Sequence, residues 1–183
     1  TDARKEKKGR LELAHGGTLF LDEVGNLSPT AQSKLLTALE KRRIVRLGGT
    51  REIPIDVRLI CATNADLHTQ VTEGTFRQDL FYRINTVEIH IPPLRERGED
   101  IHLLADHFLR TYARKYKKDI RQIARDARGK LQRYAWPGNV RELQHAIERA
   151  VVLCNADTLH ADDFLLHAPA SPVADGETLN LEA

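Results

Sequence analysis

Three stretches in the first half of the chain have the apolar pattern of strands. Residues 18–21, 57–63 and 86–91 are rich in Val, Ile, Leu and Phe, and polar residues or prolines follow each of them. Continuous apolar runs are typical of parallel strands covered on both faces. We therefore predict a strand in each stretch and expect the first two to be buried. Asp22, Glu23 and Asn64 would then lie at the carboxyl ends of these two strands.

Helices and one hairpin are predicted between these strands. Ser28 suits the N-cap and Pro29 the first turn of a helix that ends near residue 41. Residues 44–47 and 51–55 flank a Gly-Gly-Thr turn, which predicts a hairpin.

Two short helices are predicted before the third strand. Asp66 is expected to cap a helix that stops at Gly74, and residues 75–84 predict another. Arg77 and Arg83 lie six residues apart in that second helix, which places them on different sides of it.

Beyond residue 95 the pattern changes to helical periodicity. We predict one helix capped by Asp100, a weaker one through residues 123–131, a third capped by Asn139 after a Trp-Pro-Gly break, and a short last one burying Phe164 and Leu165. The predicted fold class is α/β, a parallel-sheet subdomain followed by an all-helical one.

The predicted boundaries follow from this change of pattern. Residues 1–95 form the α/β part, residues 96–166 the helical part, and residues 167–183, rich in Pro, Ala and Asp, a linker.

Composition narrows the class of protein. The 183 residues are 41% hydrophobic and 30% charged, and no apolar run approaches the ~20 residues that span a bilayer. The amino terminus has no apolar stretch of a signal peptide. Cys61 and Cys154 are far apart and expected to be reduced core residues. These features predict a cytoplasmic protein with no membrane contact.

The net charge of +2 hides a strong segregation of charge. Residues 110–133 hold ten Lys or Arg and two Asp, whereas residues 155–183 hold six acids and no Lys or Arg. The basic run is compatible with a nucleic-acid contact. Solvated, charged helix faces are commoner and are the favoured interpretation.

The acidic pair Asp22–Glu23 carries the clearest chemistry. Two carboxylates directly after an apolar strand have the pattern of a Walker B segment. The first acid would hold the Mg²⁺ of a nucleoside triphosphate through water, and the second would polarise the attacking water. The alternative is a solvated acidic turn after an ordinary strand.

The order of motifs resembles a known family. The chain is similar to the AAA+ central domain of bacterial sigma-54-dependent enhancer-binding transcriptional activators, some of which belong to two-component systems. Five motifs carry the resemblance: GGTLFLDE at 16–23, ATNADL at 62–67, GTFRQDL at 74–80 with Arg83, PPLRER at 92–97 and WPGNVREL at 136–143. It implies a P-loop-type AAA+ sheet followed by a helical lid.

The resemblance also implies roles in ATP and Mg²⁺ binding. Asp22 corresponds to the Mg²⁺-linked Walker B acid and Glu23 to the acid that activates water. Asn64 corresponds to sensor I, which reads the γ-phosphate, and Arg141 to sensor II in the lid. The alternatives are that Asn64 caps a turn and that Arg141 pairs with a nearby glutamate, either Glu142 or Glu148.

Arg77 and Arg83 correspond to the arginines that reach the ATP of a neighbouring subunit. An arginine supplied in trans makes activity depend on a ring, which in the parent protein would be a hexamer or heptamer. The alternative for either residue is a solvated surface arginine.

The chain departs from the family pattern in three places. No Gly-x-x-x-x-Gly-Lys-Ser/Thr loop occurs in these residues, so ATP and Mg²⁺ are expected to bind the parent protein rather than this fragment. Thr1, Asp2 and Ala3 correspond to the end of the GAFTGA loop that contacts sigma-54, with Asp2 in place of a glycine. A DNA-binding domain would follow Leu181.

The leading hypothesis is therefore that the chain is part of an ATPase motor that remodels sigma-54 RNA polymerase holoenzyme. The alternative is a non-catalytic assembly or binding module of an AAA+ protein. In this fold, a strand that precedes Thr1 would lie between residues 57–63 and 86–91, so we expect a gap in the sheet.

Overall fold

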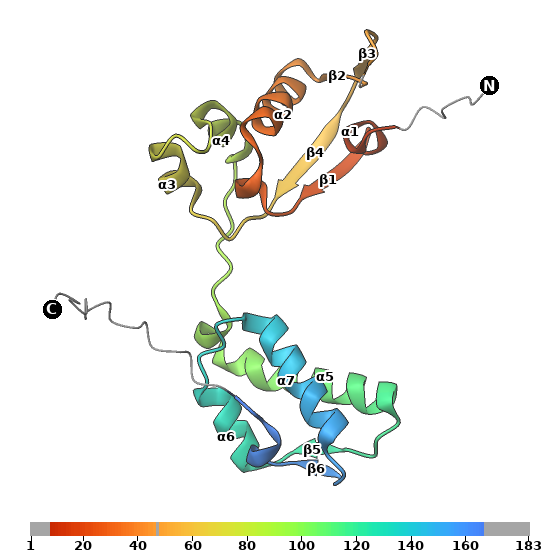
Figure 1. Ribbon diagram of the computed structural model, residues 1–183, viewed down its shortest axis with the longest axis vertical. Coiled ribbons are helices and arrows are strands. Elements are labelled where there is room, and N and C mark those ends of the chain that lie inside the picture. Colours follow the sequence, from red (N-terminus) through yellow and green to blue (C-terminus); the bar gives the residue numbers. More distant parts are fainter. Residues whose placement is uncertain (1–7, 47, 167–183) are drawn as a thin grey trace, which may run out of the picture. The chain divides into compact units, whose positions relative to one another are not determined.

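The structure is a computed structural model that describes residues 8–46 and 48–166 (Figure 1). The chain divides into two compact units, Thr1–Ile89 and His90–Ala183, and each is described by itself. The predicted linker, residues 167–183, lies outside the described residues.

The first unit combines two small sheets with helices. Its elements are α1 (Arg10–Leu13), β1 (Gly17–Leu21), the 3₁₀ helix η1 (Val24–Asn26), α2 (Pro29–Lys41), β2 (Arg43–Val45), β3 (Glu52–Pro54), β4 (Val57–Cys61), α3 (Leu67–Thr72) and α4 (Gln78–Ile84). β1 and β4 are parallel, and β2 and β3 form the predicted antiparallel hairpin.

The predicted helix starts in this unit are confirmed. The hydroxyl of Ser28 accepts a hydrogen bond from the Ala31 amide at 3.3 Å, and Pro29 is the first residue of α2. The carboxylate of Asp66 accepts from the amides of His68 and Thr69 at the start of α3. In both cases a short oxygen-bearing side chain satisfies amides that lack an intrahelical partner.

The prediction that β1 and β4 are buried on both faces is wrong for the described residues. Burial alternates along both strands, and Phe20 and Ile60 are 57% and 45% exposed. In Figure 1, α2, α3 and α4 lie on one side of this sheet. The core, made of Leu35, Leu36, Phe76, Leu80 and Phe81, lies among these helices and has Leu21 packed against it.

The predicted strand over residues 86–91 is also wrong. The segment has no strand structure, and Val87, Ile89 and Ile91 are 78%, 81% and 74% exposed. A strand is stabilised by ladder hydrogen bonds and cross-strand side-chain pairs. No strand of the described residues pairs with this segment, so its apolar pattern alone does not make it a strand.

The second unit is the predicted helical subdomain. Its elements are η2 (Leu94–Glu96), α5 (Gly98–Tyr116), β5 (Gln122–Ile123), α6 (Arg125–Arg133), α7 (Asn139–Leu153), β6 (Thr158–Leu159) and η3 (Ala161–Asp163). The two-residue parallel bridge between β5 and β6 was not expected from the sequence. It closes the segment after α7 onto the segment before α6.

The predicted helix caps of this unit differ from the structure. Helix α5 begins at Gly98, and Asp100 lies in its first turn, where it pairs with the guanidinium of Arg97 at 2.7 Å. Asn139 does not cap α7; its side-chain oxygen accepts a hydrogen bond from the Leu94 amide at 2.8 Å. This longer-range bond ties the start of α7 to η2.

The prediction that Phe164 and Leu165 are both buried is correct for Phe164 only. Phe164 is buried, whereas Leu165 is 62% exposed. The two side chains follow the short η3 rather than a helix, so the chain does not place them on a common face.

Trp136 lies at the centre of the second unit. Its side chain is fully buried, its indole N–H donates to the Leu131 carbonyl at 2.8 Å, and its ring meets Tyr134 edge-on at 4.9 Å. A buried tryptophan combines a large apolar area with a donor that needs a partner. Both requirements are met here.

We predict that Trp136→Ala lowers the free energy of unfolding by about 3–5 kcal/mol, the usual cost of emptying a large aromatic site. Chemical denaturation of the chain measures it. Leu103→Ala, at a side chain that is 68% exposed, is the control and should cost under about 0.5 kcal/mol. A Trp136→Ala shift under about 1 kcal/mol would contradict the prediction.

Glu148 joins α7 to α5 through a pair of hydrogen bonds. Its carboxylate accepts from the hydroxyl of Tyr116 at 2.7 Å and from the ammonium of Lys115 at 2.9 Å. The Tyr116 hydroxyl, followed by the Lys115 ammonium, lowers the pKa of Glu148 below its ordinary value of 4.5. The Lys115 ammonium also lies 4.9 Å from the Tyr116 ring centroid.

This shift predicts a pH dependence with a definite sign. A carboxylate with a depressed folded-state pKa contributes stability above its unfolded pKa and loses it as the pH falls. Glu148→Gln should therefore lose less unfolding free energy than the unmodified chain when the pH drops below about 5. Denaturation curves at several pH values measure this, and identical slopes for both proteins would refute it.

Candidate functional site

The acidic pair lies where β1 ends. Asp22 is exposed, and its carboxylate accepts a hydrogen bond from the Glu23 amide at 3.1 Å. Glu23 has left-handed backbone angles, φ 54° and ψ 47°. A non-glycine residue pays about 1–2 kcal/mol for this conformation, and such outliers concentrate at functional sites.

The side chain of Glu23 has an unusual environment. Its Oε2 atom is buried and has no hydrogen-bond partner among the described residues. A buried unpaired acceptor costs about 1–3 kcal/mol, so a group outside these residues is expected to satisfy it. A water molecule or a ligand hydroxyl would serve.

The segment after β1 packs closely against the segment after β4. A Cβ atom on Gly25 would lie 2.9 Å from Thr63 Oγ1 and 3.0 Å from Ala65 Cβ. The amide of Val24 donates to the Ala62 carbonyl at 3.0 Å. The two loops therefore leave the sheet side by side.

Asn64 lies at the same edge of the sheet as the two acids. The register pairs Leu21 with Cys61, so β1 and β4 end level with each other. The carboxyl ends of parallel strands are where open α/β sheets bind ligands. The Asn64 side chain is exposed and forms no hydrogen bond within the described part of the chain, so its amide is available to a ligand.

The donor set fits Mg²⁺ bound through water. No group of three or more His, Cys, Asp or Glu that could cage a metal occurs among residues 8–46 and 48–166. Mg²⁺ normally uses one or two carboxylates and keeps several waters. The exposed carboxylate of Asp22 suits that role, and the neighbouring Asn64 amide suits a phosphate oxygen.

Arg77 is held by its own unit. It precedes α4, and its guanidinium forms two hydrogen bonds to Asp79, at 2.9 and 2.6 Å, and a longer one of 3.3 Å to the Ser33 hydroxyl. The Arg77 guanidinium lowers the pKa of Asp79. Both side chains are about half exposed, 47% each, so the pair lies at the surface.

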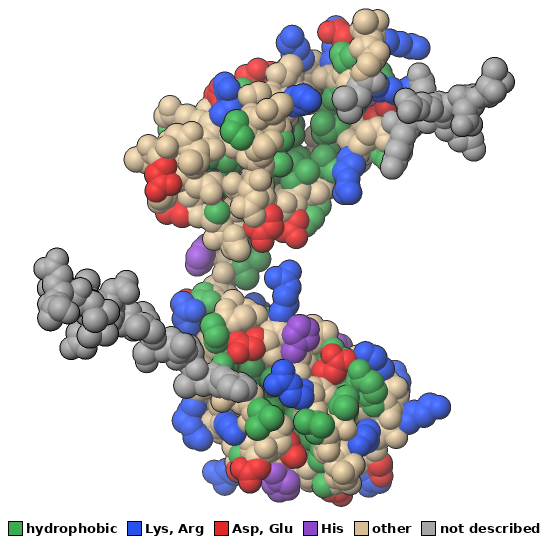
Figure 2. Space-filling view, in the orientation of Figure 1, with side chains coloured by type: hydrophobic (Ala, Val, Ile, Leu, Met, Phe, Trp, Pro, Cys, Tyr) green, Lys and Arg blue, Asp and Glu red, His purple; other side chains and the backbone are tan. Residues whose placement is uncertain are grey.

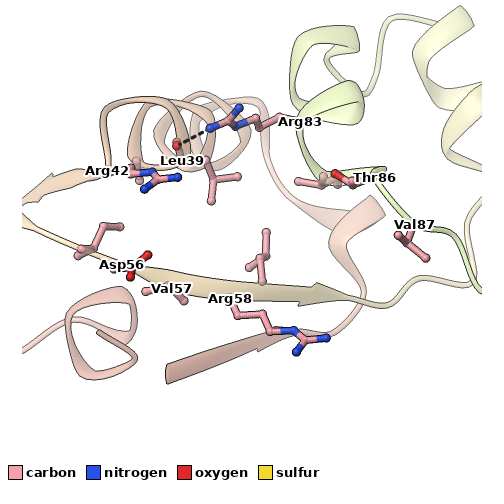
Figure 3. A pocket seen from close by; sticks show the side chains of 12 residues that line it. Leu39, Arg42, Asp56, Val57, Arg58, Arg83, Thr86 and Val87 are labelled. Carbon is pink, nitrogen blue, oxygen red and sulfur yellow. Dashed lines mark hydrogen bonds between the residues drawn. The ribbon is translucent and has the colours of Figure 1, made fainter. Parts of the chain in front are cut away.

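Arg83 lies at the other end of α4 and donates to the Leu39 carbonyl at 3.1 Å, near the carboxyl end of α2. It borders a cavity of about 390 Å³ that β4 also lines. Figure 3 shows Arg42 and Arg83 on the α2 side of β4, whereas Arg58 extends from the other side of the strand. Arg77 and Arg83 thus lie at opposite ends of α4, and the guanidinium groups of both contact α2, at Ser33 and at Leu39.

Arg141 belongs to the second unit and has an exposed side chain early in α7. The two glutamates proposed as its alternative partners are engaged elsewhere. Glu142 accepts from the Tyr134 hydroxyl at 2.9 Å and from the Gly138 amide at 2.8 Å. Glu148 accepts from the α5 side chains described above. Within the described residues no hydrogen bond or ion pair of Arg141 occurs.

The basic run of residues 110–133 is partly neutralised. Three of its cations form ion pairs: Lys115 with Glu148, Arg121 with Asp119 and Arg128 with Asp106. In Figure 2, basic and acidic side chains are interspersed over the visible face of this unit. This arrangement favours solvated helix faces.

Two further sequence predictions concern the first three residues and membrane-spanning helices. Thr1, Asp2 and Ala3 lie outside the described residues. No helix in the described ranges is both long and apolar enough to cross a bilayer.

One buried polar residue was missed by the sequence interpretation. Gln32 is 1% exposed and bonds to the loop after β1 and to the segment that carries Arg77. The signal was present: Gln32 occupies the position one helical turn before Leu35 and Leu36, on the predicted apolar face. A polar side chain at an apolar position of a helix indicates a buried hydrogen-bonding role.

Comparisons with known proteins identify both units. Residues 1–90 match the family described as the sigma-54 interaction domain, and residues 95–178 match the AAA+ ATPase lid domain. The predicted family and fold class are therefore confirmed.

Curated relatives are about half identical to the chain over the aligned residues. The nitrogen fixation protein AnfA of Azotobacter vinelandii is 50% identical over 88% of this chain and 30% of its own length. The transcriptional regulatory protein ZraR of Salmonella typhimurium is 49% identical over 94% of this chain and 39% of its own. The chain thus spans about a third of the length of these relatives.

Solved structures agree with this assignment. NtrX from Brucella abortus in complex with ATP is 37% identical, with a TM-score of 0.81, over 92% of this chain and 40% of NtrX. NtrX in complex with ADP is 38% identical, with a TM-score of 0.80, over 88% of this chain and 37% of NtrX.

The packing of Gly25 against the loop after β4 generates a prediction. Gly25→Ala should destabilise the chain by about 1–3 kcal/mol, the usual cost of overpacking, because its Cβ would meet Thr63 and Ala65. Gly9→Ala is the matched control, since a Cβ there meets nothing within 4 Å. Denaturation of both variants measures the difference, and equal stabilities would show that the loops separate freely.

Proposed function

The chain belongs to the sigma-54 interaction family of AAA+ domains, and we propose that the protein carrying it couples ATP hydrolysis in a subunit ring to remodelling of sigma-54 RNA polymerase holoenzyme. The observation that carries the proposal is the joint position of Asp22, Glu23 and Asn64 at one end of the β1–β4 sheet. The NtrX relative crystallised with ATP and with ADP supports the choice of nucleotide.

Asp22 and Glu23 would divide the chemistry between them. When bound, Mg²⁺ would offset the negative charge of the phosphates. The exposed Asp22 carboxylate would hold that ion through water. Glu23, whose Oε2 lacks a partner within the described residues, would accept a hydrogen bond from the attacking water and orient it.

Asn64 and Arg141 would each contact a phosphate. The Asn64 amide, in the loop after β4, would donate a hydrogen bond to the γ-phosphate. That bond would form only while the γ-phosphate is present. The Arg141 guanidinium, which has engaged glutamates beside it, would bind a phosphate from the lid.

Arg77 and Arg83 would act on the ATP of a neighbouring subunit. An arginine supplied in trans stabilises transition-state charge and is worth ~10³–10⁵ in rate. Arg77 would have to exchange Asp79 for a phosphate, and Arg83 would have to leave the Leu39 carbonyl. Both partners are at the surface, where such an exchange costs little.

The partners follow from the same family membership. Thr1, Asp2 and Ala3 would belong to the loop that contacts sigma-54. The ring would be a hexamer or heptamer. Contact with DNA would come from another domain of the full-length protein.

The second candidate is a non-catalytic assembly module of an AAA+ protein. The observation that favours it is the ion pair between Arg77 and Asp79, because an arginine satisfied within its own unit is less available to a neighbour's phosphate. Phosphate release by the full-length protein separates the two candidates, since an assembly module releases none.

The trans arrangement generates a complementation prediction. In the full-length protein, Arg77→Ala or Arg83→Ala should reduce ATP turnover by about 10³-fold or more and leave ATP binding to the isolated subunit unchanged. Mixing either variant with Glu23→Gln should restore part of the turnover, because some interfaces would join an intact arginine to an intact Glu23.

Lys34→Ala removes another exposed cation of the same unit and is the control, with turnover expected within about twofold of the unmodified protein. No recovery at any mixing ratio would argue that these arginines act within their own subunit or only hold structure.

A further inference from the structure

Gln32 is the one buried polar side chain among the described residues. It lies on the covered face of α2, in a unit whose other buried side chains are apolar. A buried amide is tolerated when its donors and acceptors are satisfied. The Gln32 side chain at this position therefore needs hydrogen-bond partners for its amide N–H and C=O groups.

The amide of Gln32 bonds to three backbone groups in two separate segments. Its Nε2 donates to the Leu27 carbonyl at 2.9 Å and to the Thr75 carbonyl at 3.0 Å. Its Oε1 accepts from the Arg77 amide at 2.8 Å. Both donors and one acceptor site are thus in use, and each distance is that of a good hydrogen bond.

Two of these bonds, to the Thr75 carbonyl and from the Arg77 amide, fix the backbone at and just before Arg77. The Arg77 amide precedes α4 and has no intrahelical partner, because the first amides of a helix never do. Gln32 is its acceptor. The preceding amides, those of Thr75 and Phe76, both donate to the Gln70 carbonyl, at 2.9 and 3.1 Å. Gln32 therefore supplies the last anchor before Arg77.

The third bond reaches the segment that follows the acidic pair. Leu27 directly follows η1, which begins after Glu23, and the Leu27 amide donates to the Val24 carbonyl at 3.2 Å. One buried side chain thus spans the loop of Glu23 and the segment of Arg77.

From these contacts we propose that Gln32 is a positioning residue for Arg77. It holds the amino-terminal end of α4 at a fixed place relative to the Asp22–Glu23 loop. The position of Arg77, which would contact the ATP of a neighbouring subunit, is thereby coupled to the Asp22–Glu23 loop of its own subunit. The inference rests on the proposed function, in which Arg77 acts in trans.

The chemistry of the site explains why an amide is needed. The two carbonyls require donors and the Arg77 amide requires an acceptor, and a neutral side chain of this length that offers both is glutamine. Glutamate would place carboxylate oxygens against the carbonyls of Leu27 and Thr75, with no protons to donate. Methionine has the length but neither function.

The test uses Gln32→Met and Gln32→Asn in the full-length protein. Methionine keeps the length and loses all three bonds, while asparagine keeps the amide and is one methylene too short to span both segments. Both variants should fold, bind ATP as the unmodified protein does, and lose about 100-fold in turnover, the loss expected from a displacement of about 1 Å at a catalytic group.

Subunit mixing separates positioning from a purely structural role. Gln32→Met mixed with Glu23→Gln should regain turnover, because the Glu23→Gln subunits supply a correctly placed Arg77. Gln32→Met mixed with Arg77→Ala should regain none, since neither subunit supplies one. Thr37→Ala, which removes a side-chain bond to the Ser33 carbonyl on the same helix, is the control and should keep turnover within about twofold.

Several outcomes would overturn the proposal: turnover of both Gln32 variants near that of the unmodified protein, loss of folding or of ATP binding along with turnover, or recovery with Arg77→Ala rather than with Glu23→Gln. The mixture of Arg77→Ala with Glu23→Gln is measured in parallel. Its failure to recover would refute the trans role of Arg77, and so the proposed function, independently of Gln32.

Discussion

The parallel pairing of β1 with β4 is the constraint on which the candidate site depends. Their register ends both strands level, with Leu21 opposite Cys61, and so places Asp22, Glu23 and Asn64 in loops that leave the same edge of the sheet. A slip of one residue would move every side chain of one strand to the opposite face. Gly25 then allows the two exit loops to approach, because any side chain there would meet Thr63. Backbone pairing, rather than any ion pair, therefore assembles the acids and the amide.

The arginines depend on a different kind of contact. Arg77 directly precedes α4 and Arg83 lies in its last turn. Helix α4 packs on α2 through Leu80 and Phe81, and non-directional apolar contacts alone leave it some freedom to shift. Directional bonds remove that freedom. The amide of Gln32 and the carbonyl of Leu39 fix the two ends of α4 on the same neighbouring helix. The unit thus uses apolar area for stability and a few directional hydrogen bonds for position.

The sequence predicted the elements whose signals are local. Ser28 with Pro29, Asp66, and the turn between β2 and β3 carry their own structural reasons in short windows, and the structure confirms them. Predictions that depend on partners were less successful. Residues 86–91 have a strand's pattern but no neighbouring strand among the described residues, and Asn139 bonds to Leu94, 45 residues away, rather than capping its own helix. The candidate site residues are predicted from their motifs, whereas Gln32 has no motif and is recognised only by the three bonds it makes.

The glutamates of the second unit determine whether Arg141 has an internal partner. An exposed arginine beside a free carboxylate would be partly neutralised by it, at a gain of under about 1 kcal/mol. Here both candidate carboxylates are occupied: Glu142 turns back to the Gly138 amide, and Glu148 faces α5. The Glu142 bond also closes the Trp-Pro-Gly-Asn turn, so the same contact that shapes the start of α7 engages the carboxylate next to Arg141 in the sequence. A guanidinium left in that state attracts an anion more strongly than one with a paired carboxylate, because no internal partner has to be displaced first.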